Sequence, residues 1–220
     1  MNHLVDALQL LFSPENWSGA GGFGPRLVEH LWYTAIAILI SAALAMPLGL
    51  LVGHTGRGRS LAVISTGAVR ALPSLGIITL AALFVGIGLT APMVAFVVLA
   101  VPSILAGAYA GVESVNASTV DAAKAQGMSS WQVLLRVEIP LGLPLIIGGI
   151  RNATLQVVAT ATLAAYVGAG GLGRQLFLGL RTQDYAMMLA ASIAVIALAI
   201  VLDVAFYLSQ RLLRQVPESV

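Results

Sequence analysis

Long apolar runs separated by short polar segments dominate the chain. Five of these runs approach or exceed the roughly 20 residues that a helix needs to cross the hydrocarbon core of a bilayer. They cover residues 31–52, 72–89, 91–111, 141–168 and 186–208, with Arg151 and Asp203 inside the last two. Because a chain in lipid must satisfy its own backbone hydrogen bonds, the pattern predicts an all-α, polytopic membrane fold with about five transmembrane helices.

The polar loop between the third and fourth runs, residues 113–140, carries two helix-start patterns. Ser118 followed by Asp121, and Ser129 followed by Gln132, both match the capping box. Gly127 stands where the first short helix must end, because glycine readily adopts the left-handed conformation of a helix cap. The loop is therefore predicted to hold two short helices joined at a glycine.

Small residues and a proline complete this loop. Ala122, Ala123 and Ala125 leave a smooth surface that the backbone of a partner can approach closely. Pro140 is predicted to end the second short helix before the chain re-enters the membrane. A merely connecting loop needs none of these features, so we favour a partner-docking role over a solvated surface loop.

The composition agrees with a membrane protein. Of 220 residues, 59% are hydrophobic and 9% are charged, with a mean hydropathy of +0.95, whereas soluble domains carry roughly 25% charged residues. The chain has no cysteine, its histidines (His3, His30 and His54) are scattered, and its acidic residues are dispersed. We expect no catalytic or metal site in this chain, and no basic run indicates nucleic-acid binding.

Basic residues predict the orientation, because they concentrate in the cytoplasmic loops of membrane proteins. If the N-terminus is outside, most of them face the cytoplasm: Arg57, Arg59, Arg70, Lys124, Arg136, Arg211 and Arg214. Fewer then face outward, namely Arg26, Arg174 and Arg181. We therefore predict that the N-terminus is outside and that the C-terminus and the 113–140 loop are cytoplasmic.

The segments outside the runs complete the predicted organisation. Residues 1–12 carry no basic segment, unlike a signal peptide, and predict a short amphipathic helix that ends near Ser13 and Pro14. The glycine-rich residues 19–25 predict a flexible link into the first span. The predicted parts are an extracytoplasmic segment (1–30), a transmembrane domain (31–210) and a cytoplasmic tail (211–220).

The stretch GAGGLG at residues 168–173 matches the dinucleotide-binding pattern G-x-G-x-x-G. That site requires a preceding strand and an acidic residue about 20 positions further on. Here an apolar run precedes the glycines, Asp184 is the next acid, and the loop is predicted to lie outside. We exclude a nucleotide site and keep two alternatives, a helix cap and part of an outer gate or docking surface, for Gly168, Gly170, Gly171 and Gly173.

The 113–140 loop resembles the EAA motif of permease subunits of ABC importers, which reads E-A-A, three residues, G, nine residues, then I-x-L-P. The matching positions are Asp121, Ala122, Ala123, Gly127, Val137, Ile139 and Pro140. Both spacings hold, although Asp replaces the first Glu and so shortens the reach of that carboxylate. The resemblance implies a coupling helix that seats in a groove of an ATP-hydrolysing subunit.

Residues 69–92, 121–151 and 160–173 together resemble permeases for osmoprotectants such as glycine betaine and choline. The resemblance implies two ATPase subunits that bind ATP and magnesium, a second permease copy or homologous permease, and an extracytoplasmic binding protein that selects the solute. Methionine-type permeases share the glycine stretch, so an amino-acid cargo stays open. A passive channel is a third hypothesis, under which a bulky residue at Gly127 should leave transport intact.

Two ionisable residues lie inside the apolar runs, where charges are costly. At 1.5 Å per residue, Arg151 lies roughly 15 Å and Asp203 roughly 12 Å from the cytoplasmic ends of their helices. Their similar depths predict an ion pair. It can be a structural staple, or it can break and form as the transport path opens.

Polar residues also recur along the fourth run. Asn152, Gln156 and Thr160 follow an i, i+4, i+8 spacing and share one helix face. Such side chains either form interhelical hydrogen bonds or line the solute path. Tyr109 and Tyr166 are further path candidates, because aromatic faces attract quaternary ammonium groups.

Overall fold

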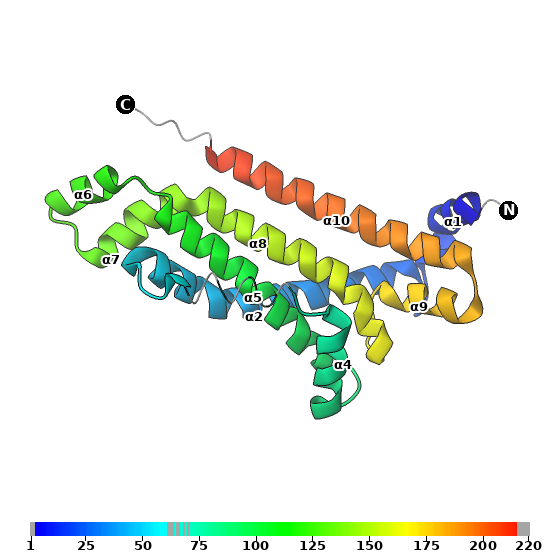
Figure 1. Ribbon diagram of the computed structural model, residues 1–220. Helices are drawn as coiled ribbons and strands as arrows, with labels where there is room; N and C mark the ends of the chain where they lie inside the picture. Colours follow the sequence, from blue (N-terminus) through cyan, green and yellow to red (C-terminus); the bar gives the residue numbers. More distant parts are fainter. Residues whose placement is uncertain (1–2, 61–63, 65–66, 68, 70, 215–220) are drawn as a thin grey trace. The chain divides into compact units, whose positions relative to one another are not determined.

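The computed structural model describes the chain except for residues 1–2, 61–63, 65–66, 68, 70 and 215–220. Every secondary-structure element in the described part is helical, which confirms the all-α prediction (Figure 1). Arg70, the side chain of Arg214 and residues 215–220 of the predicted tail lie outside this part.

The elements follow one another as short and long helices (Figure 1). In chain order they are α1 (His3–Phe12), η1 (Pro14–Trp17), α2 (Phe23–Thr55), α4 (Ser74–Val85), α5 (Thr90–Glu113), α6 (Ala117–Ala125), α7 (Ser130–Val133), η2 (Leu134–Glu138), α8 (Ile139–Ala161), η3 (Thr162–Val167), α9 (Gly173–Thr182) and α10 (Tyr185–Arg214). The predicted N-terminal helix is confirmed as α1. The predicted link 19–25 is shorter than expected, because α2 already begins at Phe23.

Four stretches of the described chain are long and apolar enough to cross a membrane: Phe23–Thr55, Thr90–Glu113, Ser130–Val167 and Tyr185–Leu213. The predicted count of five is not confirmed. In the run 72–89 the helix α4 has only 12 residues, or roughly 18 Å. Pro73 stands at its N-cap, and Gly86, with φ +87°, ends it.

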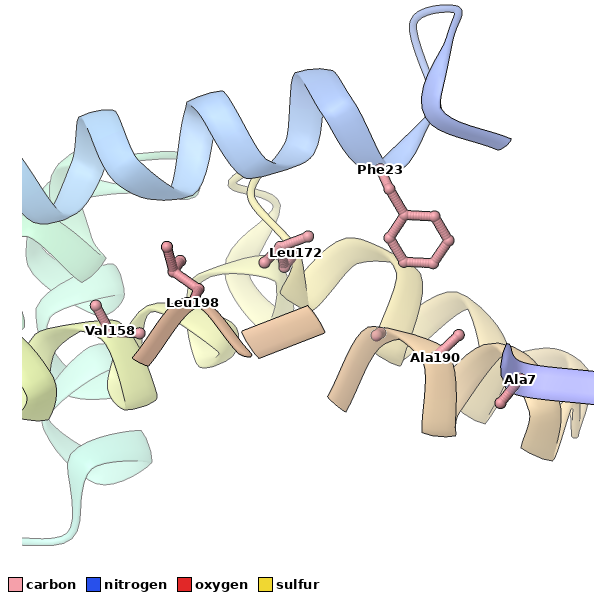
Figure 2. Packing of buried hydrophobic residues seen from close by; sticks show 7 residues of the cluster. Ala7, Phe23, Val158, Leu172, Ala190 and Leu198 are labelled. Carbon is pink, nitrogen blue, oxygen red and sulfur yellow. The ribbon is translucent and has the colours of Figure 1, made fainter. Parts of the chain in front are cut away.

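The described chain divides into two packed units. The first comprises Met1–Ile38, Leu72–Val97 and Thr154–Leu202, and the second comprises Leu39–Ala71, Val98–Ala153 and Asp203–Val220. In the first unit, buried residues of α1, α2, α8 and α10 and of the segment before α9 form one cluster (Figure 2). Its members are Ala7, Phe23, Val158, Leu172, Ala190, Ala191 and Leu198.

The buried side chain of His30 forms hydrogen bonds with two other segments of the first unit. The N–H of Leu172 donates to its Nδ1 over 3.3 Å, so Nε2 carries the proton and donates to the carbonyl of Val158 over 2.9 Å. The ring is fully buried. His30 is therefore a structural link between α2, α8 and the segment that leads into α9.

Glycines bring the helices of the second unit together. A Cβ on Gly107 of α5 would lie 2.5 Å from Cα of Gly149 on α8, which is closer than real atoms approach. A Cβ on Gly53 of α2 would lie 2.7 Å from Cβ of Val112 on α5. Gly107 and Gly111 have the G-x-x-x-G spacing that lets membrane helices pack closely. This spacing is a signal in the sequence for the close contact of α5 with α8.

Candidate functional site

The predicted two-helix loop is present in the second unit. We call α6, α7 and η2 the coupling element. Asn116, not Ser118, caps the N-terminus of α6, because its Oδ1 accepts hydrogen bonds from the Ser118 N–H over 3.0 Å and from the Ser118 hydroxyl over 2.9 Å. The capping box that we predicted from Ser118 and Asp121 is therefore wrong. Asparagine is among the strongest N-cap residues, and here it comes two positions earlier.

Gly127 ends α6 as predicted. It has φ +85°, its N–H donates to the carbonyl of Lys124 over 2.9 Å, and the N–H of Met128 donates to that of Ala123 over 3.2 Å. These two bonds form a Schellman motif, which favours glycine at this position. Nothing lies within 4 Å of a Cβ built on Gly127. Glycine is therefore favoured here by the backbone conformation of the turn and not by close packing.

The second start signal is also confirmed. The hydroxyl of Ser129 accepts from the N–H of Gln132 over 3.4 Å, and the N–H of Ser129 donates to Gln132 Oε1 over 2.8 Å. The prediction that Pro140 ends this helix is wrong, since helix continues into α8. A π-helical turn, Leu134–Glu138, ends two positions before the proline. Pro140 then stands in the first turn of α8, where proline is tolerated.

The EAA-like positions differ in exposure. Asp121 and Ala122 are exposed, whereas Ala123 is buried against the rest of the unit. In the second half of the motif, Trp131 and Leu135 expose large apolar side chains. The coupling element thus has buried residues and exposed residues, and the exposed Trp131 and Leu135 line an apolar pocket together with residues of α2.

A histidine that the sequence analysis left unassigned ties this element to α2. Nδ1 of His54 lies 2.5 Å from Oε2 of Glu138, and Nε2 lies 2.6 Å from the hydroxyl of Ser130. Glu138 is buried. One imidazole therefore connects the last turn of α2 to both α7 and η2.

An ion pair joins Arg59, in the chain after α2, to the end of α5. Nη1 of Arg59 lies 2.8 Å from Oε1 of Glu113 at the end of α5. The guanidinium also lies 5.8 Å from the ring centroid of Tyr109. A cation thus already occupies one face of the Tyr109 ring, which weakens the case for Tyr109 as a contact for a quaternary ammonium.

The predicted pair of Arg151 and Asp203 is confirmed. Nε and Nη2 of Arg151 donate to the two carboxylate oxygens of Asp203 over 2.6 and 2.7 Å. Gln210, which the sequence analysis missed, accepts from Arg151 Nη1 over 3.4 Å and donates to the carbonyl of Pro144 over 2.8 Å. The bidentate pair and the amide together join α8 to α10.

The polar stripe on α8 is not uniform. Asn152 is exposed, Gln156 is half-buried and Thr160 is buried. The hydroxyl of Thr160 donates a hydrogen bond to the carbonyl of Gln156 over 2.8 Å, so this donor is satisfied within its own helix. A role of the stripe in the solute path stays a prediction.

The glycine stretch is a packed loop between η3 and α9. Gly168 caps η3 with φ +86°, which confirms the helix-cap alternative at this position. Gly171 has φ +80°, and its N–H donates to Oε2 of Glu29 over 2.9 Å. A Cβ on Gly170 or Gly173 would collide with Glu29 or with the backbone of Thr162. Glycine is therefore needed at Gly170 and Gly173 because other segments of this chain pack against them.

The chain is similar in sequence to known transport proteins. The family described as "Binding-protein-dependent transport system inner membrane component" matches residues 45–215. The glycine betaine/carnitine/choline transport system permease protein OpuCB of Bacillus subtilis (strain 168) is 33% identical over 183 residues, which cover 83% of this chain and 84% of that protein. The osmoprotectant import permease protein OsmW of Salmonella typhimurium is 33% identical over 192 residues, covering 84% and 88%.

The fold is shared with a solved importer. A chain of the inward-facing MetNI methionine ABC transporter superposes with a TM-score of 0.74 at 21% identity. The match covers 87% of this chain and 95% of that one.

Proposed function

This chain belongs to the family of binding-protein-dependent transport system inner membrane components, and from this premise we propose that it forms the membrane path of an ATP-driven importer of an osmoprotectant. The cargo is glycine betaine, choline or another quaternary amine. The observation that carries the proposal is the similarity to permeases named for these solutes over more than four fifths of the chain. A methionine cargo has less support, since the likeness to the methionine transporter, at 21% identity, concerns the fold.

The coupling element is the proposed contact for the ATPase. Its exposed residues include Asp121, Ala122 and Ala125 of α6, and the apolar side chains of Trp131 and Leu135 follow further along the chain. Small residues let a partner backbone approach, and exposed apolar side chains provide area to bury on binding. ATP and magnesium are bound by the ATPase in this proposal, and the permease carries out no chemical step.

The proposed topology has five crossings, with the N-terminus outside and the C-terminus inside. Gly49 packs on Leu105 and Gly53 on Val112, so α2 and α5 run parallel. The 24 residues of α5 extend roughly 36 Å. Two successive membrane helices that run parallel require a crossing between them. We assign this fifth crossing to the run 72–89, which contains α4.

The proposed assembly contains two permeases, two ATPases and an extracytoplasmic binding protein. Five helices are too few to enclose a solute path between two gates, so a second copy or a homologous permease completes it. ATP binding then draws the coupling elements together and switches the path from inward-facing to outward-facing.

Affinity purification of the full chain from native membranes tests this function. We expect an ATPase to co-purify with the unchanged chain and to be lost from Gly127→Trp, because the indole fills the free space beside α6. Gly19→Trp is the matched control: Gly19 also has a positive φ, +77°, and nothing within 4 Å of its Cβ position. Recovery of the chain alone, or an ATPase retained by Gly127→Trp, would contradict the proposal and favour a passive channel.

The cargo needs a separate measurement. ATP-dependent uptake of glycine betaine, choline and methionine by the reconstituted complex, with its binding protein, should show a quaternary amine as the substrate. Uptake of methionine alone would overturn the cargo assignment and leave the importer mechanism in place.

A further inference from the structure

A cavity of about 480 Å³ lies within the first unit, between the start of α2, η3 and α9. Three arginines line it, Arg26, Arg174 and Arg181, together with the aromatic residues Tyr166 and Phe177. Its size falls in the range of small-molecule sites, which are roughly 300–1,000 Å³. Neither the coupling element nor the Arg151–Asp203 pair belongs to this cavity.

One face of α9 supplies most of the charge. Arg174, Phe177 and Arg181 follow an i, i+3, i+7 spacing, which places them on the same side of the helix. The preceding Leu172 is buried in the cluster of the first unit, and Gly179 is buried in the middle of α9. Packing on both sides thus fixes the helix that holds the arginines.

The guanidinium groups are only partly compensated, because the carboxylate of Glu29 attracts Arg174 as well as Arg26. Arg26 forms a salt bridge with Glu29 over 2.7 Å. For Arg174 and Arg181, which are both exposed, the described part of the chain provides no carboxylate within 4.0 Å. Three guanidinium groups and one carboxylate leave the cavity with a positive potential, which favours an anionic group. A carboxylate suits it, because guanidinium groups bind carboxylates through paired hydrogen bonds.

The aromatic residues that line the cavity, Tyr166 and Phe177, favour a cation. The rings of Tyr166 and Phe177 lie 6.0 Å apart between centroids at an angle of 51°. Two tilted ring faces attract a quaternary ammonium group, which cannot form hydrogen bonds of its own. The same cavity is thus lined by arginines, which attract an anion, and by aromatic rings, which attract a cation.

Gln175 adds an unused acceptor to the lining. Its side chain is 6% exposed, and its Nε2 donates to the carbonyl of Gly21 over 2.5 Å. Its Oε1 is buried and has no hydrogen-bond partner among the described residues. Buried acceptors are rarely left unpaired, and this one belongs to a residue that lines the cavity.

We propose that this cavity is a recognition site of the permease itself for quaternary amines that carry a carboxylate, such as glycine betaine and carnitine. Arg174 and Arg181 bind the carboxylate, and Tyr166 and Phe177 face the methylated ammonium. The inference rests on the proposed function and narrows its substrate class. Choline has the ammonium but no carboxylate, so it meets the positive potential without the compensating contact.

The shape of the site favours a small molecule over a macromolecule. An acidic surface of a binding protein, or the headgroups of anionic lipids, would also be attracted by the arginines. Neither of these partners requires a concave cavity with a pair of tilted aromatic rings in its wall. The experiment separates all three.

The test compares solutes on the complete importer in nanodiscs, without binding protein. Saturation-transfer NMR of the methyl protons reports binding of glycine betaine, carnitine and choline. We expect glycine betaine and carnitine to bind more tightly than choline, and the double variant Arg174→Gln/Arg181→Gln to weaken their binding by roughly tenfold or more while choline binding stays the same or improves. Phe177→Leu should weaken all three. Arg211→Gln, an exposed arginine far along the chain, is the matched control.

Uptake assays with a binding protein that accepts both solutes give the second readout. The double variant should lower the ratio of glycine betaine to choline uptake. An equal loss of both would overturn the proposal and indicate docking of the binding protein on the arginines. A loss that disappears in nanodiscs of neutral lipid would overturn it in favour of lipid contact. If the unchanged importer transports quaternary amines but none binds without binding protein, the cavity proposal fails and the proposed function stands.

Discussion

Glu138 lies buried at the end of a π-helical turn, with its Oε2 2.5 Å from Nδ1 of His54 on α2. The contact joins residues 84 positions apart in the sequence. Because η2 is the last part of the coupling element and leads into α8, this contact joins the element to α2 in addition to its continuation into α8. The imidazole thus connects the proposed ATPase contact to a second membrane helix.

His54→Ala should uncouple ATP hydrolysis from transport. The change leaves Glu138 buried without its partner, and removal of one member of a buried pair costs about 3–5 kcal/mol. We expect a lower unfolding temperature and uptake reduced at least tenfold, with basal ATP hydrolysis by the assembled complex retained. Thermal unfolding in detergent and paired uptake and hydrolysis assays measure these effects.

Glu138→Gln serves as the companion to this variant. It keeps the shape and a hydrogen bond to His54 and should be closer to the unchanged protein on both measurements. If His54→Ala lowered hydrolysis and uptake in the same proportion, the contact would be structural only.

The Arg151–Asp203 pair allows its two interpretations to be separated. Either single substitution, Arg151→Met or Asp203→Leu, leaves one charge in the membrane at a cost of roughly 2.5–3.5 kcal/mol. The double substitution removes both charges and should restore stability. Thermal unfolding of the three variants checks this.

Uptake by the double variant then decides the role of the pair. A staple predicts that stability and uptake recover together. A pair that breaks during transport predicts a stable protein with impaired uptake. Single variants as stable as the unchanged chain would contradict both interpretations.

Gly107→Ala should separate α5 from α8. Its Cβ would lie 2.5 Å from Cα of Gly149, and backbone cannot move aside as a side chain can. Overpacking of this kind costs about 1–3 kcal/mol, which thermal unfolding would detect. Gly148→Ala is the control, since its Cβ would approach only the side-chain amide of Gln210, at 3.2 Å. Equal stability of the two variants would disprove the close helix contact.

The absence of cysteine in the chain makes single-cysteine labelling a direct test of the topology. With a membrane-impermeant maleimide on intact cells, we expect Ser18→Cys and Thr90→Cys to react from outside. Ser60→Cys and Thr119→Cys should react only after the membrane is opened. All four positions are exposed. Thr90→Cys and Ser60→Cys labelled from the same side would rule out a crossing by the chain between them.

Local signals in the sequence were sufficient for much of the coupling element. Gly127 ends α6 and Ser129 begins α7 as predicted, because caps depend on residues within one turn of each other. The same kind of reasoning failed at Ser118, where Asn116 competes for the same N–H groups. It also failed at Pro140, which stands in the first turn of α8 after the π-turn, a position where proline is tolerated.

The sequence by itself determined the membrane fold and the depth of charged residues within it. A bilayer fixes the direction of each apolar helix, so counting residues was enough to bring Arg151 and Asp203 to the same level. Which helices lie side by side was decided only by the tertiary structure. Three features depend on this lateral packing: the contact of His54 with Glu138, the packing of Gly107 on Gly149, and the position of the arginines around the cavity beside α9. The sequence could not predict them, because a side of a helix that faces lipid is as hydrophobic as a side that faces another helix.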